Sequence, residues 1–331
     1  TNKGIKMAFD EINAKGGIKG KKIKLVTEDN QGKNEETAKV VNRLITQEKI
    51  IALIGEVASS RSLIAAPIAQ KNGIPMVSPS STNPEVTQKG DNIFRVCFID
   101  PFQGLVMAKF AIENLKVKKA AIFRKNGDAY SEGLANVFAT EFKKMGGDIV
   151  IDIQYQPKDI DFKAQLAEIK AKKPDVIFVP GYYSDAGNIA KQAKQIELKA
   201  TLLGGDGWDS PKLHEIGGEA INGHYFSNHY TTESTDPVVV EFIKKFKARY
   251  NDEVPDGLAA LGYDAAKIVA EAIERAADLK PTMIRDEIAK TKDFVGVTGK
   301  ISMNAERNAV KSAVVVQVDG EKRKYVTTIN P

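Results

Sequence analysis

Apolar residues in the first hundred positions recur with two alternating periods, one typical of amphipathic helices and one of buried strands. The predicted helices are 4–14, 34–47 and a third that Ser59 or Ser60 can cap. The predicted strands are 22–27, 50–55 and 73–77. The second strand is fully apolar, as expected in a sheet that is covered on both faces. Helix and strand therefore alternate, which predicts a parallel doubly wound α/β sheet.

The pattern restarts after Asp100-Pro101 and predicts a second α/β set of similar size. Its predicted helices are 102–115, 131–145, 162–172 and 185–195, and its strands are 119–123, 148–154, 175–179, 201–204 and 223–227. Beyond Thr231 the pattern predicts helices at 237–250, 257–277 and 282–290, and then strands at 294–302, 313–318 and 324–329. Asp319-Gly320 is a hairpin turn signal. With 331 residues, the chain is expected to form two α/β domains.

Composition narrows the classes of function. The 48 basic and 43 acidic residues are interspersed and give a net charge of only +5, so no nucleic-acid partner is expected. No apolar run reaches the roughly 20 residues of a membrane helix. The single cysteine, Cys97, excludes an intrachain disulfide and is expected to be a buried core residue. The three histidines are unclustered, so we expect no metal site and no histidine in a candidate site.

Polar residues follow the predicted strand 73–77 directly, in the segment Ser78 to Pro84. Ligands of open α/β sheets bind at the carboxyl ends of strands, where hydroxyls and backbone N–H groups suit a carboxylate or another small anion. Taken alone, the segment is more often a Ser/Pro/Asn-rich loop without a ligand. Whether this segment binds a ligand therefore has to be judged together with the residues at the other strand ends.

The other predicted strand ends carry three kinds of group. Hydroxyls and helix N-terminal amides, which suit an anion, occur at Ser59, Ser60, Ser80 and Thr82. Asp206, flanked by glycines, suits a cation, and the aromatic residues are Tyr130, Tyr182, Tyr183 and Trp208. An anion site in one domain and a cation site in the other predict a zwitterionic ligand, of which a free amino acid is the simplest. The alternatives are a turn aspartate at Asp206, packing roles for Tyr182 and Tyr183, a position covering a domain edge for Trp208 and a helix cap at Ser59-Ser60.

Enzymatic motifs are missing from the sequence. It contains no GxSxG nucleophile elbow, no GxxxxGK[ST] phosphate loop, no HExxH and no GxGxxG after a strand. Gly204-Gly205-Asp206-Gly207 follows a strand but lacks the spacing of a dinucleotide fingerprint. We therefore expect neither an enzyme nor a cofactor.

Five segments carry a resemblance to a known family: VSPSSTNPEVT, AYSEGLA, PGYYSDA, LLGGDGWDSPKL and ALGYDAAKI. From about Gly4 to the end, the chain resembles the branched-chain amino-acid (Leu/Ile/Val-type) substrate-binding proteins of ABC transporters, which are type I periplasmic binding proteins. The resemblance implies two α/β lobes that close on one amino acid, an ABC permease as partner, and a monomer that is periplasmic or extracellular and lipid-anchored. The alternative is a sensing module of the same fold that feeds a receptor or regulator.

The resemblance also implies roles for seven residues: Ser59, Ser80, Thr82, Tyr130, Tyr182, Asp206 and Tyr263. Ser59 and Thr82 match residues that hold the ligand's α-carboxylate, and Ser80 contributes backbone. Asp206 matches the acceptor of the α-ammonium, with Tyr130 beside it. Tyr182 and Tyr263 match aromatics near the ligand, although Tyr263 lies on a predicted helix where core packing is the ordinary expectation. Asp206→Ala is accordingly expected to abolish binding and to leave the ligand-free melting temperature nearly unchanged.

The resemblance further predicts lobe boundaries and two departures from the family. The first lobe is expected at 1–99 with 231–303 and the second at 100–230 with 304–331, joined by hinges near Asp100, Tyr230 and Ser302. A first strand and its loop are expected before Thr1, so the first sheet is expected to be one strand short. The best-known members carry a disulfide in the first lobe that this chain cannot form.

Overall fold

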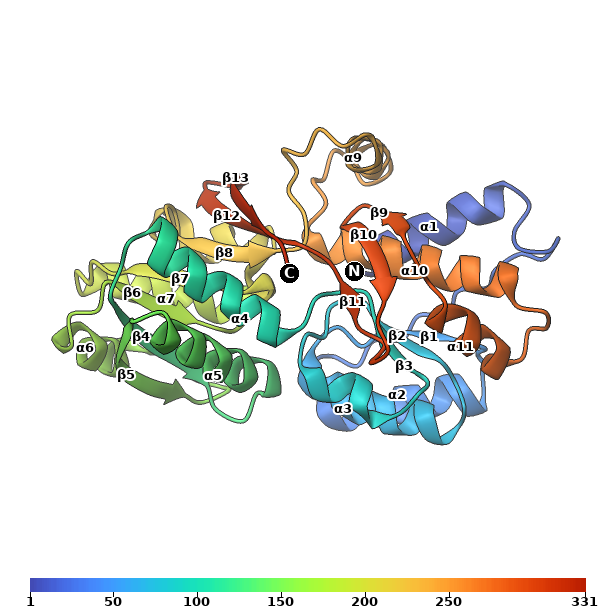
Figure 1. Ribbon diagram of the computed structural model, residues 1–331, viewed down its shortest axis with the longest axis horizontal. Helices are drawn as coiled ribbons and strands as arrows, with labels where there is room; N and C mark the ends of the chain where they lie inside the picture. Colours follow the sequence, from blue (N-terminus) through green and yellow to red (C-terminus); the bar gives the residue numbers. More distant parts are fainter. The chain divides into compact units, whose positions relative to one another are not determined.

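The computed structural model describes residues 1–331, which form two compact units (Figure 1). Unit 1 comprises Thr1–Ile99 and Ser234–Lys311, and unit 2 comprises Asp100–Glu233 and Ser312–Pro331. The resemblance, together with the restart of the pattern, predicts the corresponding ends at 99, 230 and 303. Residues up to Lys311 stay in unit 1 because β11 (Ala309–Val310) pairs with β10 (Gly299–Met303). Backbone N–H of Arg95 also donates to the carbonyl of Arg307 at 3.2 Å.

Unit 1 contains a short parallel sheet in the order β1-β2-β3 and a separate antiparallel sheet in the order β11-β10-β9. The remaining strands of unit 1 are β1 (Leu53–Ile54), β2 (Met76–Ser78), β3 (Ile93–Arg95) and β9 (Phe294–Gly296). β1 pairs only with β2, in the register Leu53↔Met76. β1 is therefore the edge of the parallel sheet.

Helices cover the parallel sheet of unit 1, and α1 lies alongside α10 (Figure 1). The helices are α1 (Asn2–Ala14), α2 (Asn34–Thr46), α3 (Ser59–Lys71), α9 (Pro237–Arg249), α10 (Gly257–Arg275) and α11 (Pro281–Ala289). A 3₁₀ turn, η1 (Pro84–Lys89), follows β2. Gly4 permits the close approach of α1 to α10, since a Cβ at this position would lie 1.9 Å from the carbonyl oxygen of Ala259. Val41 and Leu44 of α2 pack with Ala65 of α3 and Met76 of β2 in one core.

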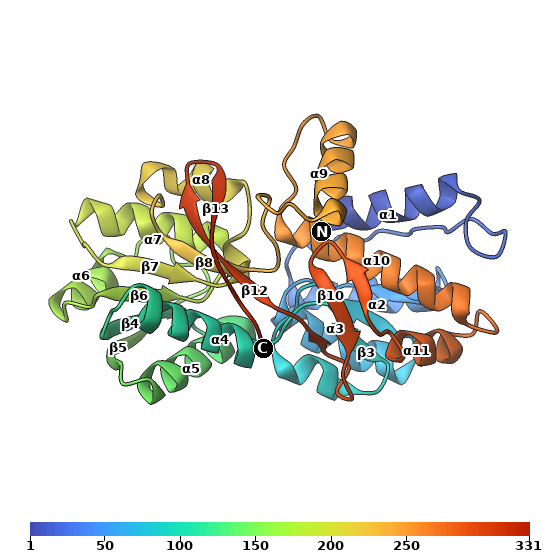
Figure 2. The ribbon, with the colours of Figure 1, turned by 45° about the horizontal axis from the view of Figure 1, so that its top comes forward.

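Unit 2 is built on one seven-stranded sheet in the order β13-β12-β8-β7-β6-β4-β5. Its strands are β4 (Lys119–Lys125), β5 (Asp148–Tyr155), β6 (Val176–Val179), β7 (Thr201–Gly204), β8 (Tyr225–Asn228), β12 (Ala313–Asp319) and β13 (Lys322–Ile329). β4 to β8 pair in parallel, whereas β12 and β13 join antiparallel. The β12–β13 hairpin is strongly twisted (Figure 2), and its register shifts between Val315 and Val316. The hairpin turn signalled by Asp319-Gly320 is present: Gly320 and Glu321 form the two-residue loop between the paired Asp319 and Lys322.

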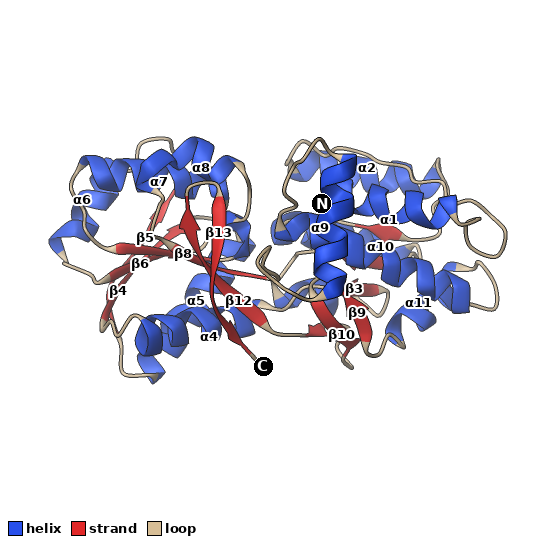
Figure 3. Ribbon diagram, turned by 90° about the horizontal axis from the view of Figure 1, so that it is seen from above, coloured by secondary structure: helices blue, strands red, loops and turns tan.

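Helices lie on both faces of the unit 2 sheet. Figure 3 shows α6, α7 and α8 on one face and α4 and α5 on the other. They are α4 (Asp100–Lys109), continued by a π turn over Phe110–Asn114, α5 (Ala129–Lys144), α6 (Lys163–Ala171), α7 (Tyr183–Gln195) and α8 (Lys212–Gly217). Phe123, Tyr155, Phe162 and Trp208 belong to the core on the α6–α8 face. None of the helices in the chain is both long and apolar enough to cross a membrane.

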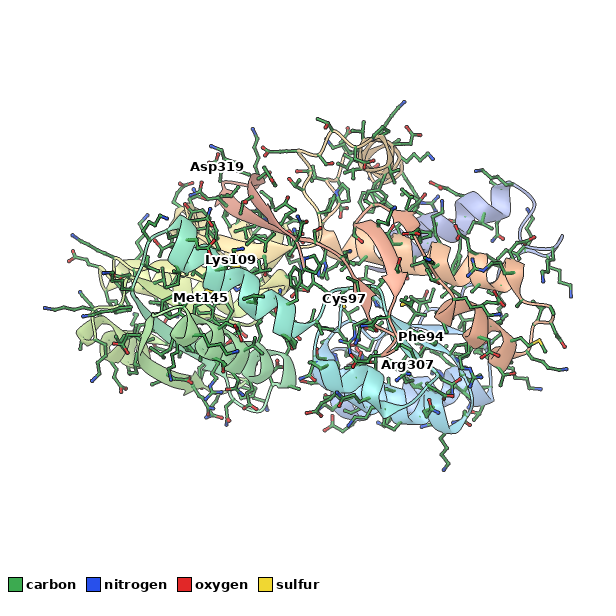
Figure 4. All side chains as sticks on the ribbon, viewed as in Figure 1. Phe94, Cys97, Lys109, Met145, Arg307 and Asp319 are labelled. Carbon is green, nitrogen blue, oxygen red and sulfur yellow. The ribbon has the colours of Figure 1, made fainter.

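Three local predictions meet different outcomes. Residues 22–27 form no strand, so that prediction is wrong: their backbone has no ladder partner, and alternation of apolar residues cannot supply one. Neither Ser59 nor Ser60 is the cap of α3, because Ala58 occupies the N-cap position and Ser59 is the first helical residue. The buried position predicted for Cys97 is confirmed, and its side chain is 0% exposed within unit 1 (Figure 4).

Candidate functional site

Serine hydroxyls tie the segment after β2 to the segment after β1 in unit 1. We call residues 78–83 the hydroxyl loop. Ser78 Oγ donates to the Glu56 carbonyl at 2.6 Å, and both Ser80 Oγ and Ser81 Oγ donate to the Val57 carbonyl at 3.0 Å. Since β1 and β2 are parallel neighbours, their carboxyl ends lie at the same edge of the sheet. The serines therefore hold the loop against the start of α3.

Thr82 is the one residue of the hydroxyl loop whose side-chain oxygen is buried without a partner. Its side chain is 0% exposed, and Oγ1 has no hydrogen bond. Ser59 lies beside the loop, and its Oγ accepts from the backbone N–H of Asn83 at 3.2 Å, which leaves the hydroxyl hydrogen for another acceptor. A buried hydroxyl without a partner costs about 1–3 kcal/mol, so an acceptor bound at Thr82 would account for it.

The first amide of α3 adds a further donor near these hydroxyls. The intrahelical bonds of α3 begin at Arg61, whose N–H donates to the Ala58 carbonyl at 3.1 Å. The N–H of Ser59 precedes that bond and has no partner inside the helix. Amides at a helix start favour a negatively charged group. The hydroxyl loop and the start of α3 thus form an anion-type half-site, which we call the Thr82 half-site.

Asp206 lies in unit 2 directly after β7, in the 3₁₀ turn η3 (Asp206–Trp208), and is 4% exposed. Its Oδ1 accepts from Tyr130 OH and from Gln103 Nε2, both at 2.9 Å. Its Oδ2 lies 2.9 Å from His229 Nε2. Gln103 Nε2 also donates to Ser227 Oγ at 3.0 Å. Asp206 is therefore a buried carboxylate held by three side chains, and we call this group the Asp206 half-site.

The expectation that no histidine lies in a candidate site is wrong, because His229 contacts Asp206. His229 follows β8, which pairs in parallel with β7, so the residues after both strands meet at one edge of the sheet. Gln103 was also missed, since it projects from the middle of α4. Neither residue has a sequence signal of its own. The pairing of β7 with β8 would have pointed to His229, but local sequence patterns do not reveal the order of strands in a sheet.

Tyr130 serves the Asp206 half-site as a hydrogen-bond donor. Burial, and secondarily the charge of Asp206, raises the pKa of the Tyr130 hydroxyl well above its usual value of 10. The hydroxyl therefore stays protonated and donates to Asp206, while its oxygen accepts from the backbone N–H of Gly207 at 3.2 Å. Both bonding directions of this hydroxyl are used to hold the turn.

Gly205 permits this arrangement, because a Cβ there would lie 2.4 Å from Tyr130 OH and 3.1 Å from Gln103 Nε2. We expect Gly205→Ala to push both donors away from Asp206. The melting temperature should fall, with a loss of about 1–3 kcal/mol in unfolding free energy. Ligand affinity should fall at least about tenfold, a change of 1.4 kcal/mol. Calorimetry of this variant beside Ser184→Ala, an exposed change on α7, tests it. Unchanged affinity in Gly205→Ala would contradict the role given to the two donors.

The aromatic residues at the strand ends of unit 2 fall into two groups. The Tyr182 ring lies 5.4 Å from the Tyr130 ring and is partly exposed. Trp208, in contrast, is fully buried, its Nε1 donates to the Val179 carbonyl at 3.0 Å, and its ring lies 6.2 Å from Phe226. Trp208 is therefore a core residue of unit 2, and it neither lines a site nor covers a domain edge. Tyr183 is partly buried against the same core.

Tyr263 lies on α10 in unit 1 and is buried. Its hydroxyl donates to Glu11 Oε2 at 2.8 Å, and its ring lies 5.1 Å from that of Phe242. No hydrogen bond joins it to the hydroxyl loop. The structure thus brings together Ser59, Ser80 and Thr82 in unit 1, and Tyr130, Tyr182 and Asp206 in unit 2, and places Tyr263 in a separate contact of unit 1.

Two α/β units with polar half-sites at the ends of parallel strands define a two-domain α/β ligand-binding protein. A family model described as periplasmic binding protein matches residues 1–323. The crystal structure of the leucine-binding protein LivK of Thermotoga maritima MSB8 is 41% identical with a TM-score of 0.95, covering 99% of this chain and 93% of that chain. The isoleucine complex of the branched-chain amino-acid transporter substrate-binding protein LivJ of Streptococcus pneumoniae is 36% identical with a TM-score of 0.94, covering 100% and 94%.

A relative found by sequence similarity supports the same assignment. The Leu/Ile/Val-binding protein BraC3 of Rhizobium johnstonii is 34% identical over 226 residues, which are 68% of this chain and 61% of that protein. The chain belongs to the periplasmic binding protein family, and within it to the branched-chain amino-acid substrate-binding proteins of ABC transporters. The resemblance and the α/β fold predicted from the sequence are thereby confirmed.

Proposed function

We propose that this chain captures a free branched-chain amino acid and delivers it, chemically unchanged, to an ABC permease. The observation that carries the proposal is the complementarity of the two half-sites. One offers a buried hydroxyl without a partner at Thr82, and the other a buried carboxylate at Asp206. An α-amino acid carries one group for each. The similar proteins named for leucine, isoleucine and valine support the aliphatic side chain.

In this proposal the Thr82 half-site binds the ligand's α-carboxylate. Thr82 Oγ1 and Ser59 Oγ donate their hydroxyl hydrogens, and the first amides of α3 face the same charge. Ser80 contributes its backbone, because its hydroxyl is already donated to Val57. Hydrogen bonds to an ionised acceptor are about twice as strong as neutral ones, so few donors suffice.

The Asp206 half-site binds the α-ammonium. A carboxylate has about four lone-pair positions, and Tyr130, Gln103 and His229 account for three of them. The remaining position, on Oδ2, is the one proposed for the ammonium group. The paired rings of Tyr130 and Tyr182 supply an apolar surface next to it. Tyr263 is proposed at the edge of the site in unit 1.

The proposal extends to the protein's surroundings. Since ligand capture requires no bond to be made or broken, no enzymatic activity is proposed. The chain acts outside the cytoplasm, in the periplasm or attached to a lipid anchor at the cell surface. It works as a monomer that binds no nucleic acid, and hinges near residues 100, 230 and 302 carry the closing motion.

A thermal melt with each of the twenty amino acids tests the proposal. A ligand at about one hundred times its dissociation constant adds roughly 2.7 kcal/mol, which for this size corresponds to a rise of about 2–4 °C. Leucine, isoleucine or valine should give the largest rise. The matched controls are 4-methyl-2-oxopentanoate, which lacks the ammonium group, and isopentylamine, which lacks the carboxylate. A rise with the oxo acid equal to that with leucine would sink the role of Asp206, and no rise with any amino acid would sink the function.

A further inference from the structure

The Asp206 half-site contains a second ionisable side chain, to which the proposed function gives no role of its own. His229 follows β8, and its side chain is 1% exposed. Its Nε2 lies 2.9 Å from Asp206 Oδ2, the oxygen proposed for the ligand's ammonium group. Its backbone N–H donates to Asn228 Oδ1 at 2.8 Å, which holds the chain next to the ring. The imidazole and the ammonium group would therefore share one carboxylate oxygen.

This contact determines where the imidazole gains its charge. A carboxylate oxygen only accepts hydrogen bonds, so Nε2 of His229 carries a hydrogen whether the ring is neutral or charged. The proton that charges the ring is therefore gained or lost at Nδ1. While the ring is neutral, Asp206 and His229 together carry one net negative charge. Once the ring is protonated, the pair has no net charge.

Two ionisable side chains of neighbouring helices lie close to this pair. Tyr130 of α5 donates to Asp206 Oδ1 at 2.9 Å, and burial raises the pKa of its hydroxyl well above the usual value of 10. Tyr130 therefore keeps its proton near neutral pH. Asp100, the first residue of α4, is a buried carboxylate whose charge acts on Tyr130.

The strands beside β8 add one ion pair and no further histidine. Asn228 Nδ2 donates to Asp209 Oδ2 at 2.8 Å, and Asp209 Oδ1 lies 3.5 Å from Arg323 Nε on β13. β12 brings the uncharged Val314 opposite Asn228. Imidazole is the one side-chain group here whose ordinary charge change falls between about pH 5 and 8. His229 is therefore the group in this half-site that is suited to respond to pH.

We propose that His229 is a positioning residue that makes amino-acid binding depend on pH, because its protonation competes with the ligand's ammonium group for Asp206. The inference rests on the proposed function. With a neutral ring, His229 holds Asp206 Oδ2 through Nε2–H and leaves the negative charge to the ammonium group. With a protonated ring, that charge is already neutralised, and a second buried cation would lack a partner. Binding of the ammonium group therefore expels the Nδ1 proton into the solvent, and bound ligand in turn opposes protonation of the ring.

Titration calorimetry of the full chain with leucine, between about pH 5 and 8, tests this inference. Below the titration midpoint of His229, the affinity should fall by about tenfold for each pH unit, since one proton is exchanged. Repeating each titration in two buffers with different heats of ionisation counts the protons released, which should approach one per bound leucine at the acidic end. Proton NMR of the His229 ring should show a titration midpoint that moves to lower pH when leucine is bound.

Two variants separate this imidazole from the rest of the chain. His229→Gln keeps a side-chain N–H for Asp206 but cannot gain a proton, so its affinity should change by less than about twofold over the same range. His214→Gln, on α8, is the matched control and should keep the pH dependence of the wild type. The remaining histidine, His224, titrates outside this range, because burial lowers its pKa to about 4.

Three results would overturn the inference and leave the proposed function intact. They are a wild-type affinity for leucine that is independent of pH, a pH dependence that persists in His229→Gln, and a count of released protons near zero. The proton count is made on the wild type, so it decides the matter even where His229→Gln does not fold. Failure of leucine, isoleucine and valine to bind at any pH would instead overturn the proposed function, and this inference with it.

Discussion

Asp206→Asn is expected to weaken amino-acid binding by about 10²–10³-fold. The substitution keeps the shape of the side chain, and its oxygen still accepts from Tyr130 and Gln103. It removes the negative charge that the proposed site offers to the α-ammonium group. Leaving one member of a buried charge pair alone costs about 3–5 kcal/mol, and each 1.4 kcal/mol is tenfold in affinity. Isothermal titration with leucine, isoleucine and valine measures the loss.

Asp209→Asn is the matched control, because Asp209 is also a buried carboxylate of unit 2 and is 4% exposed. Its Oδ2 accepts from Asn228 Nδ2 at 2.8 Å, and its Oδ1 lies 3.5 Å from Arg323 Nε. This variant should lose stability and keep its affinity within about threefold, well inside the 1.4 kcal/mol of a tenfold change. Affinity for leucine that stays at the wild-type level in Asp206→Asn would show that Asp206 does not receive the ammonium group.

Asp206→Ala is expected to behave differently from the asparagine variant. It leaves three buried groups, on Tyr130, Gln103 and His229, without their acceptor. Each such group costs about 1–3 kcal/mol. The ligand-free melting temperature should therefore fall as well. This prediction replaces the expectation from sequence that the ligand-free melting temperature stays nearly unchanged, because the sequence did not reveal the three donors.

Thr82→Val is expected to weaken binding by about 10–100-fold without destabilising the ligand-free protein. A hydrogen bond to a charged group contributes about 1.5–3 kcal/mol, and valine cannot make it. In the ligand-free protein the Thr82 hydroxyl is buried without a partner, so replacing it by a methyl group removes an unsatisfied polar atom. The melting temperature should stay the same or rise. Titration calorimetry and melting of the two proteins, each with and without leucine, measure both effects.

Ser81→Ala is the control, because Ser81 belongs to the same loop but has partners. Its Oγ lies 2.7 Å from Ser62 Oγ and donates to the Val57 carbonyl at 3.0 Å. Here the ligand-free melting temperature should fall, and affinity should fall less than in Thr82→Val. The reverse pattern, with Thr82→Val unstable and still binding at wild-type affinity, would assign Thr82 to the core instead of the ligand.

Most of the fold follows from local patterns in the sequence. Period and turn signals place α1, α2, α3 and the strands of unit 2 within a few residues of their observed bounds. They succeed because burial on one face of a helix, or on both faces of a strand, is recorded in nearby residues. The predicted strand at 22–27 fails because a strand needs a hydrogen-bonded neighbour, and apolar alternation carries no information about whether one is present.

The sequence by itself determined which residue types stand at the strand ends: hydroxyls after β2 and a carboxylate after β7. Tertiary structure decided what those groups do. It brought Gln103 and His229 to Asp206, bonded the serines of the hydroxyl loop to Glu56 and Val57, and left Thr82 without a partner. The physical reason is that a hydrogen bond depends on a few tenths of an ångström between groups that are far apart in the chain. Hydrophobic periodicity is a local property, and it determines which elements form but not which side chains meet.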